Sequence, residues 1–225
     1  MELRQYPEIT RRVGAVRANR LESDREATRR LANAPALFGE MRQPSHRYLA
    51  IPKTSSERRS YIPMGFLNPD VIASTELFTA PDATLYHFGI LTSTMHMAWV
   101  RAVCGRLKSD YRYSAGVVYN NFPWPDVTDK QRSNIEAAAQ GVLDARAQHS
   151  DSSLADLYDP LAMPADLSKA HGSLDRSVDA AYGKTSLKSE AERVSFLFVL
   201  YEKLTSMFPA VPKAAAKRRG ARARA

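Results

Sequence analysis

The sequence predicts an α+β fold in which a mixed domain of short strands and one buried helix precedes a small α-helical bundle. Residues 46–124 hold short apolar segments separated by prolines, a pattern typical of strands and turns rather than long helices. Within them, an apolar run at 85–107 has the spacing of a buried helix over about 90–104. From Thr128 onward, apolar residues recur at helical intervals in three further segments.

The front of the chain is predicted to be helical. Residues 8–33 are rich in Arg, Ala, Leu and Glu, and their apolar residues have helical spacing, which indicates one or two helices. Short strands are then expected at 48–51, 61–62, 71–73 and 77–78. Gly105 stands where a glycine stop would end the helix, an extended segment follows over 105–114, and a further strand is expected at 116–119.

Two capping-box patterns mark helix starts in the back half of the chain, Thr128 with Gln131 and Ser189 with Glu192. A third helix is expected near 165–182, which makes residues 126–208 a three-helix bundle. The sequence thus predicts four parts: a helical lead-in (1–44), a mixed domain (45–125), a helical domain (126–210) and a disordered basic tail (211–225).

Charge is distributed unevenly over these parts. The formal net charge is +8, of which residues 213–225 supply +6, whereas residues 125–212 sum to −4. A basic front half suggests that this half faces a polyanion. The single Cys104 excludes an internal disulfide framework and a CxxC metal site. No apolar run approaches the roughly 20 residues of a membrane span, so a cytoplasmic protein that does not enter the membrane is expected.

The segment 105–114 is the strongest candidate for a functional surface. In an extended strand Lys108, Asp110 and Arg112 project from one face, and Tyr111 and Tyr113 project from the other. A row with both signs of charge suits base edges in the DNA major groove, where Lys or Arg donates to guanine and Asp accepts from cytosine. The alternative is a solvated edge strand with a weak surface ion pair. The tyrosines are expected to pack on the helix at 90–104.

Several segments resemble the MmeI-like type II (type IIL) restriction–modification enzymes. They are YLAIPKTSSERR (48–59), YIPMGFL (61–67), PDATLYHFGILTS (81–93), GRLKSDYRYS (105–114) and VYNNFPWP (118–125), with ADLYDP (155–160) and LDRSVD (174–179) in the helical half. Members of this family join an endonuclease, an adenine-N6 methyltransferase and a DNA target-recognition domain in one polypeptide. The resemblance implies that residues 46–124 are a target-recognition domain and that 126–208 are the helical domain that helps clasp DNA.

The resemblance also implies roles for individual residues. Lys108 and Asp110 would read one base pair together, and Arg112 with Glu76 would read a neighbouring one. The run Ser55-Ser56-Glu57-Arg58-Arg59 offers hydroxyls and guanidinia for phosphates, although a polar loop without a function is an equal alternative. Lys53 and Arg106 are further candidates for contacts with the DNA backbone.

No catalytic or metal-binding residue is predicted in this chain. A DNA-adenine methyltransferase needs an Asn/Asp-Pro-Pro-Tyr/Phe motif, which Asn120-Asn121-Phe122-Pro123 resembles only superficially, and no PD-(D/E)xK nuclease pattern occurs. His87 and His96 lack a carboxylate or cysteine at ligand spacing, so core or surface histidines are expected. S-adenosylmethionine and Mg²⁺ are expected only for the parent enzyme.

The expected function is therefore sequence-specific recognition of double-stranded DNA by a chain without enzymatic activity of its own. It would serve a methyltransferase domain in cis or in trans, as a fragment, a separate specificity polypeptide or the product of a split gene. Two alternatives remain open from the sequence: a helical module that binds another protein, and a nuclease or transferase whose site carries no familiar motif.

Overall fold

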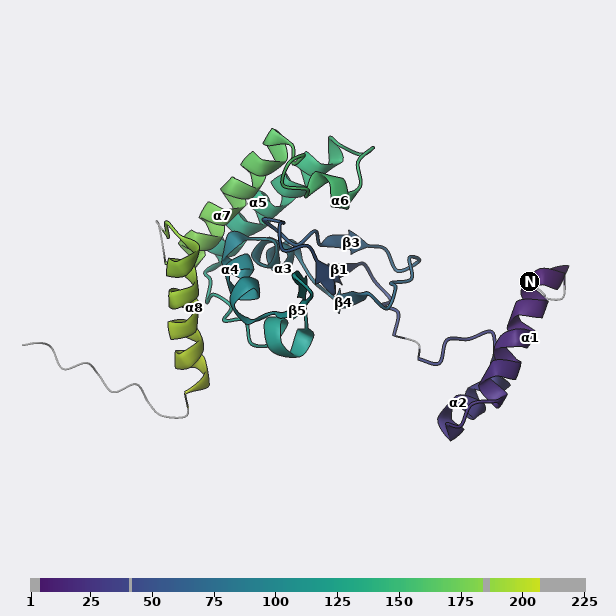
Figure 1. Cartoon of the computed structure of the whole chain (residues 1–225). Helices are drawn as coiled ribbons and strands as arrows, with labels where there is room; N and C mark the ends of the chain where they lie inside the picture. The colour runs from purple at the N-terminus through teal and green to yellow at the C-terminus, as the bar shows by residue number, and fades with distance from the viewer. Residues whose placement is uncertain (1–4, 41, 184–186, 207–225) are drawn as a thin grey trace, which may run out of the picture. The chain divides into compact units, whose positions relative to one another are not determined.

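The computed structural model describes residues 5–40, 42–183 and 187–206, and the basic tail predicted at 211–225 lies outside this part of the chain. The chain divides into two compact units, Met1–Gln43 and Pro44–Ala225. Small antiparallel sheets, buried helices and a helical C-terminal region make up the second unit, which confirms the predicted α+β class (Figure 1).

The first unit is a small helical hairpin, and its helices agree with the one or two helices that the sequence predicts. It comprises α1 (Pro7–Leu21), α2 (Glu26–Arg30) and the 3₁₀ turn η2 (Leu31–Asn33). Pro7 suits the first helical turn because its missing N–H would have no partner there. The Arg20 guanidinium closes the hairpin by donating to three carbonyl oxygens at 2.8–3.0 Å, those of Leu31, Ala34 and Leu37. Ala32 is the one buried side chain among this unit's described residues, so the hairpin has almost no core of its own.

The second unit contains two three-stranded antiparallel sheets. Sheet A has the order β3-β1-β4, with bounds Gly65–Leu67, Tyr48–Pro52 and Leu77–Pro81. Sheet B has the order β2-β6-β5, with bounds Thr54–Ser55, Asp110–Arg112 and Gly105–Leu107. Strand β1 lies at the centre of sheet A and is buried over its first four residues, as a core strand should be.

Two of the four strands predicted before the central helices are confirmed, those at 48–51 and 77–78. The strand predicted at 61–62 is wrong, because both side chains are buried but the backbone forms a loop. Pro63, which follows, has no N–H that could donate a hydrogen bond to a neighbouring strand. The strand predicted at 71–73 is also wrong. A turn occupies this segment, in which the Val71 N–H donates to the Asn68 carbonyl, and Ile72 is 64% exposed.

The predicted central helix is two helices, α3 (Leu85–Leu91) and α4 (Thr94–Val103). The Ser93 hydroxyl accepts from the His96 N–H and so begins a new helix within the apolar run. Gly105 does not act as a left-handed helix stop, because α4 ends at Val103, Cys104 after it is extended, and Gly105 begins β5. The strand predicted at 116–119 is wrong too: Ala115–Tyr119 form a π-helical turn, η3.

The C-terminal helices are α5 (Asp129–Ala147), α6 (Leu154–Leu157), α7 (Ala165–Ala181) and α8 (Glu190–Thr205). Helices α5 and α7 pack on each other and on α3, whereas α8 packs on α4 (Figure 1). In the contact between α8 and α4, the Trp99 ring meets Phe198 and Tyr201. The helical bundle is therefore built around α3 and α4 and shares its core with the strand-bearing part. At Gly89 of α3 a Cβ atom would lie 2.8 Å from the Ile135 side chain, so glycine allows α3 and α5 their close approach.

A chain of buried polar contacts runs from the strand-bearing part into α5 and α7. The Arg146 guanidinium donates to the Met64 carbonyl at 2.7 Å and to the Tyr158 hydroxyl at 2.8 Å. The Tyr158 hydroxyl lies 2.6 Å from Nε2 of His171, and burial lowers the pKa of His171 to about 3, so this ring is neutral. Because all of these groups are buried, removing any one of them would leave the hydrogen-bonding group of its partner buried and unsatisfied.

Further contacts of His171 and α7 lead back to the strand-bearing part. The Tyr61 ring stacks on His171 with centroids 3.9 Å apart, and its hydroxyl donates to Asp175 at 2.8 Å. Asp175 in turn accepts from the Thr94 N–H at 2.7 Å. These contacts fix α7 against the start of α4, which explains why residues from 44 onward form one compact unit.

Candidate nucleic-acid interface

The segment 105–114 is a β-hairpin, not the single strand that the sequence predicts. Strands β5 and β6 pair in register from Leu107 opposite Asp110 to Gly105 opposite Arg112, and Lys108 and Ser109 form the turn between them. Lys108 has a left-handed backbone with φ of 56°. The predicted row of three charges along one strand is therefore wrong: Asp110 and Arg112 share a face of β6, and Lys108 lies in the hairpin turn, where it is exposed.

The predicted burial of the two tyrosines is confirmed. Tyr111 and Tyr113 are each 3% exposed. The Tyr111 hydroxyl accepts from Nε of Arg101 in α4 at 3.3 Å, and the Tyr113 hydroxyl lies 3.0 Å from Nε2 of His96, also in α4. These contacts hold β6 on the helix, so the opposite face of the strand, with Asp110 and Arg112, is turned toward the surface.

Arg112, Glu76 and Thr54 form a cluster on this surface, called the Arg112 cluster below. Nη1 of Arg112 donates to the Thr54 hydroxyl at 2.7 Å and to Oε2 of Glu76 at 3.1 Å. The Arg112 and Glu76 side chains are 43% and 66% exposed. The structure thus brings together the two residues that were assigned to one base pair, Arg112 in β6 and Glu76 in the turn before β4, 36 residues apart in the chain. Thr54 was not predicted, because only the pairing of β2 with β6 places it opposite Arg112.

Lys53 anchors the loop that carries Glu76. Its backbone N–H donates to the Glu76 carbonyl at 2.9 Å, and its ammonium donates to the Thr75 carbonyl. The ammonium also lies 4.9 Å from the centre of the Phe78 ring. Lys53 is half-buried, so its side chain supports the Glu76 loop as well as facing the surface.

The second group of charges lies around Asp110. Its carboxylate accepts from the Glu57 N–H at 3.4 Å, which ties the hairpin to the loop after β2. The Arg106 guanidinium covers the Tyr111 ring at 4.2 Å and donates to the Ser109 carbonyl at 2.9 Å. Arg106 is exposed and lies on the same hairpin as Lys108. The hairpin and the loop at 56–59 therefore present several cations and two carboxylates side by side.

Of the five residues proposed from 55–59 and the hairpin for the DNA backbone, Ser55 does not fit. It is 2% exposed, pairs with Tyr111 across the sheet, and its hydroxyl is enclosed by protein, so a phosphate has no access to it. Ser56 is half-buried and its hydroxyl accepts from the Arg58 N–H at 3.4 Å. Arg58 is exposed, and Arg59 is half-buried with its carbonyl bonded to Arg101.

The two histidines singled out by the sequence have structural roles. Nδ1 of His87 accepts from the Thr84 N–H at 3.1 Å and caps α3. His96 is fully buried, and burial lowers its pKa to about 3. Within the described part of the chain, no three His, Cys, Asp or Glu residues converge as metal ligands would.

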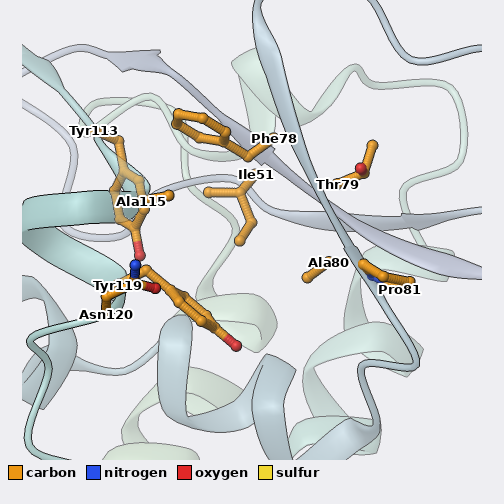
Figure 2. Close-up of a pocket in the computed structure, with 9 residues that line it drawn as sticks. All are labelled: Ile51, Phe78, Thr79, Ala80, Pro81, Tyr113, Ala115, Tyr119 and Asn120. Carbon is orange, nitrogen blue, oxygen red and sulfur yellow. The ribbon is translucent and has the colours of Figure 1, made fainter. Parts of the chain in front are cut away.

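A cavity of about 290 Å³ lies between β1, β4 and the η3 turn (Figure 2). Its lining is mostly apolar and aromatic: Ile51, Phe78, Thr79, Ala80, Pro81, Tyr113, Ala115, Tyr119 and Asn120. These side chains include no carboxylate and no imidazole, so the cavity offers no group for acid–base chemistry near neutral pH. In the described residues, no helix has both the length and the apolar composition of a membrane span.

Known proteins match this chain over nearly its whole length. The family model "MmeI, target recognition domain" matches residues 1–126, and "MmeI, C-terminal domain" matches 127–208. The DNA methyltransferase A of Bacillus subtilis (strain 168) is 40% identical over 204 residues, which are 91% of this chain and 23% of that protein.

A solved structure of the type IIL restriction–modification enzyme MmeI in complex with DNA is also similar. It matches with a TM-score of 0.84 and 46% identity over 90% of this chain and 27% of that one. The chain thus spans about a quarter of the length of these two relatives. Taken with the family models, this similarity shows that the chain belongs to the MmeI family and carries its target recognition and C-terminal domains.

Proposed function

We propose that this chain recognises a specific sequence in duplex DNA on behalf of a DNA methyltransferase of the type IIL restriction–modification class. The observation that carries the proposal is the exposed face of sheet B, where charges of both signs are held in fixed positions by tyrosines packed on α4. Base edges present donors and acceptors together, so a surface that reads them needs both signs. One relative of known structure is MmeI in complex with DNA.

Lys108 and Asp110 act together on one base pair, and Arg112 with Glu76 acts on a neighbouring one. Lys108 lies in the hairpin turn two residues before Asp110, and this nearness in the chain supports a shared base pair although the two do not share a strand face. Lys108 donates to an acceptor base edge and Asp110 accepts from an exocyclic amine. Lys53, Ser56, Arg58, Arg59 and Arg106 border these groups and contact phosphates, which fix the register of the protein on the duplex.

The chemistry belongs to the methyltransferase portion, supplied in cis or in trans, and this chain has no catalytic activity by itself. Adenine-N6 methylation and DNA cleavage would use S-adenosylmethionine and Mg²⁺ bound outside this chain. The cavity of Figure 2 does not suit S-adenosylmethionine, since its lining has no carboxylate for the ribose hydroxyls or the ammonium group. Such a protein works in the cytoplasm, where bacterial DNA lies.

The first test is a binding selection from a duplex library with randomised positions, at low salt, with the full chain. The wild type selects a defined sequence, and Lys108→Ala or Asp110→Ala lowers discrimination at one base pair by about 1–3 kcal/mol. Asp151→Ala, which removes an exposed carboxylate in the helical half, is the matched control and leaves the preference unchanged. A chain that binds no DNA under these conditions but co-purifies with another protein would replace this proposal with the interaction-module alternative.

A further inference from the structure

We infer that Thr54 is a positioning residue that, together with Glu76, fixes one end of the Arg112 guanidinium so that its other edge faces a guanine. The inference rests on the proposed function and names a residue and a base that the function alone does not give. It follows from which guanidinium nitrogen of Arg112 already donates hydrogen bonds within the protein and which nitrogens are free to donate to DNA.

Nη1 of Arg112 has two N–H groups, and the structure gives it two acceptors. These are the Thr54 hydroxyl at 2.7 Å and Oε2 of Glu76 at 3.1 Å. Nη2 and Nε make no hydrogen bond to any described residue, and the side chain is 43% exposed. The free edge therefore carries two parallel N–H donors in one plane, which is the fork that arginine uses in bidentate contacts.

A fork of two donors selects guanine among the four bases. Guanine presents two acceptors, O6 and N7, at its major-groove edge. Adenine presents the acceptor N7 beside the donor N6, so one N–H of the fork would face the N–H of the adenine amine instead of an acceptor. Thymine presents one acceptor and cytosine none, so neither can accept from both donors. If the fork is held rigidly, this difference appears as preference for guanine at the base pair that Arg112 contacts.

The backbone fixes the acceptors that hold Arg112. Thr54 lies opposite Arg112 in the β2–β6 pairing, and the Tyr113 N–H donates to the Lys53 carbonyl at 2.8 Å beside this pair. The Lys53 N–H bonds to the Glu76 carbonyl at 2.9 Å, so both acceptors depend on one short stretch of chain. An arginine ordered before binding loses less rotamer freedom on the DNA than a free one does.

An exposed ion pair with Glu76 alone would not order Arg112, because surface pairs are weak and mobile. Thr54 differs from Glu76 in that its hydroxyl sits on a sheet strand and its side chain is short and β-branched, with few rotamers. Its hydroxyl is therefore a stationary acceptor. The alternative is that Glu76 and Thr54 mask Arg112 in the free protein and release it when DNA binds. In that case, removing the Thr54 hydroxyl would strengthen the preference for guanine.

The experiment compares Thr54→Val, which keeps the shape and removes the acceptor, with Thr54→Ser, which keeps the hydroxyl. Base preference is measured by the library selection at the position that Arg112→Ala disturbs, and thermal unfolding confirms that each variant is folded. We expect guanine at that position in the wild type, a fall in guanine preference of about 3–10-fold in Thr54→Val, and recovery in Thr54→Ser. Thr75→Val, an exposed neighbour whose side chain does not touch Arg112, is the control and keeps the preference.

A second measurement needs no DNA. The Nε–Hε NMR signal of Arg112, with its ¹⁵N relaxation, should report an ordered side chain in the wild type and in Thr54→Ser and a mobile one in Thr54→Val. An equally mobile Arg112 in all three would overturn the positioning role, whatever the chain does with DNA.

The two proposals fail in different ways. If Arg112→Ala leaves the preference unchanged at every position, the assignment of Arg112 as a base reader fails. If Arg112→Ala removes a preference that Thr54→Val leaves intact or strengthens, the function stands and the positioning inference is wrong. A base other than guanine at that position would overturn the assignment of the free Nε–Nη2 edge.

Discussion

At the scale of single residues, the environment distinguishes two of the proposed base readers, Asp110 and Arg112, from one of the proposed phosphate contacts, Arg58. The orientation of Asp110 is limited by its hydrogen bond with the Glu57 N–H. The orientation of Arg112 is limited by its hydrogen bonds to Thr54 and Glu76. The Arg58 side chain is exposed and makes no hydrogen bond or ion pair with a described residue, so it can follow a phosphate without a fixed geometry. Directional recognition needs fixed groups, whereas attraction to phosphates does not.

Arg58→Ala should therefore weaken binding to all sequences alike. Loss of one phosphate contact should lower the slope of log K against log salt concentration by about 0.9, without a change in the selected sequence. Titrations at several salt concentrations measure this slope. Lys130→Ala removes an exposed cation from α5 and serves as the control with an unchanged slope. A change of base preference in Arg58→Ala would show that this residue reads bases instead.

At the scale of elements, the hairpin β5–β6 shows what the sequence could and could not predict. The alternation of charged and aromatic residues predicted the two faces of β6 correctly, because that periodicity is local. The turn at Lys108 was missed because neither Lys108 nor Ser109 is a residue that favours a tight hairpin turn. Pairing with β2 gives β6 its second neighbour, at Tyr111 and Arg112, and no local pattern reports a pairing between segments 56 residues apart.

The same contrast holds for the helices. Thr128 and Ser189 were recognised as helix starts because a cap needs only neighbouring residues, and both cap their helices in the structure. Ser93 is an equally local signal inside the apolar run, yet hydrophobic periodicity continued across it and concealed the break. Thr54 could not have been found, since its relation to Arg112 exists only in the folded sheet.

The left-handed backbone of Lys108 makes a prediction about stability. A side chain at positive φ costs roughly 1 kcal/mol, and glycine does not carry this cost. Lys108→Gly should therefore raise the free energy of unfolding by about 0.5–1 kcal/mol while it removes the base preference assigned to Lys108. Chemical denaturation together with the library selection measures both effects. Lys108→Ala should lose the preference without gaining stability, and a Lys108→Gly protein that keeps the preference would contradict the role of Lys108.

At the scale of the whole molecule, the strand-bearing part and the C-terminal helices of the second unit share one core. Tyr61, Met64 and Thr94 contact Asp175, Arg146 and their neighbours through buried hydrogen bonds. The sequence predicted both parts but not this junction, since the residues that form it are up to 114 residues apart and no local pattern connects them. The two parts should therefore unfold together.

The buried histidines give this unit a predicted sensitivity to acid. Burial lowers the pKa of His96 and of His171 to about 3, against about 6.5 in the unfolded chain. Between these two pKa values the unfolded state binds protons on the two histidines and the folded state does not. The free energy of unfolding therefore falls as the pH drops below about 6.5. Each histidine contributes at most about 1.4 kcal/mol per pH unit. Burial raises the pKa of Asp175 and acts in the opposite direction nearer pH 4, so the window from about 6.5 to 5 is the informative one.

Denaturation at several pH values measures this slope, and His96→Leu should reduce it by up to about 1.4 kcal/mol per pH unit, the contribution of one buried histidine. A stability that does not change over that window would mean that the histidines are accessible to protons in the folded protein.

The central claim is that the hairpin β5–β6 reads base edges in duplex DNA, and a charge reversal tests it most directly. In the variant that combines Lys108→Asp with Asp110→Lys, the donor and the acceptor exchange places while the net charge stays the same. The selected base should change at one position and remain the same at all others, with little change in affinity for random DNA. An unchanged selected sequence, with wild-type folding and affinity, would show that these two side chains do not read the DNA.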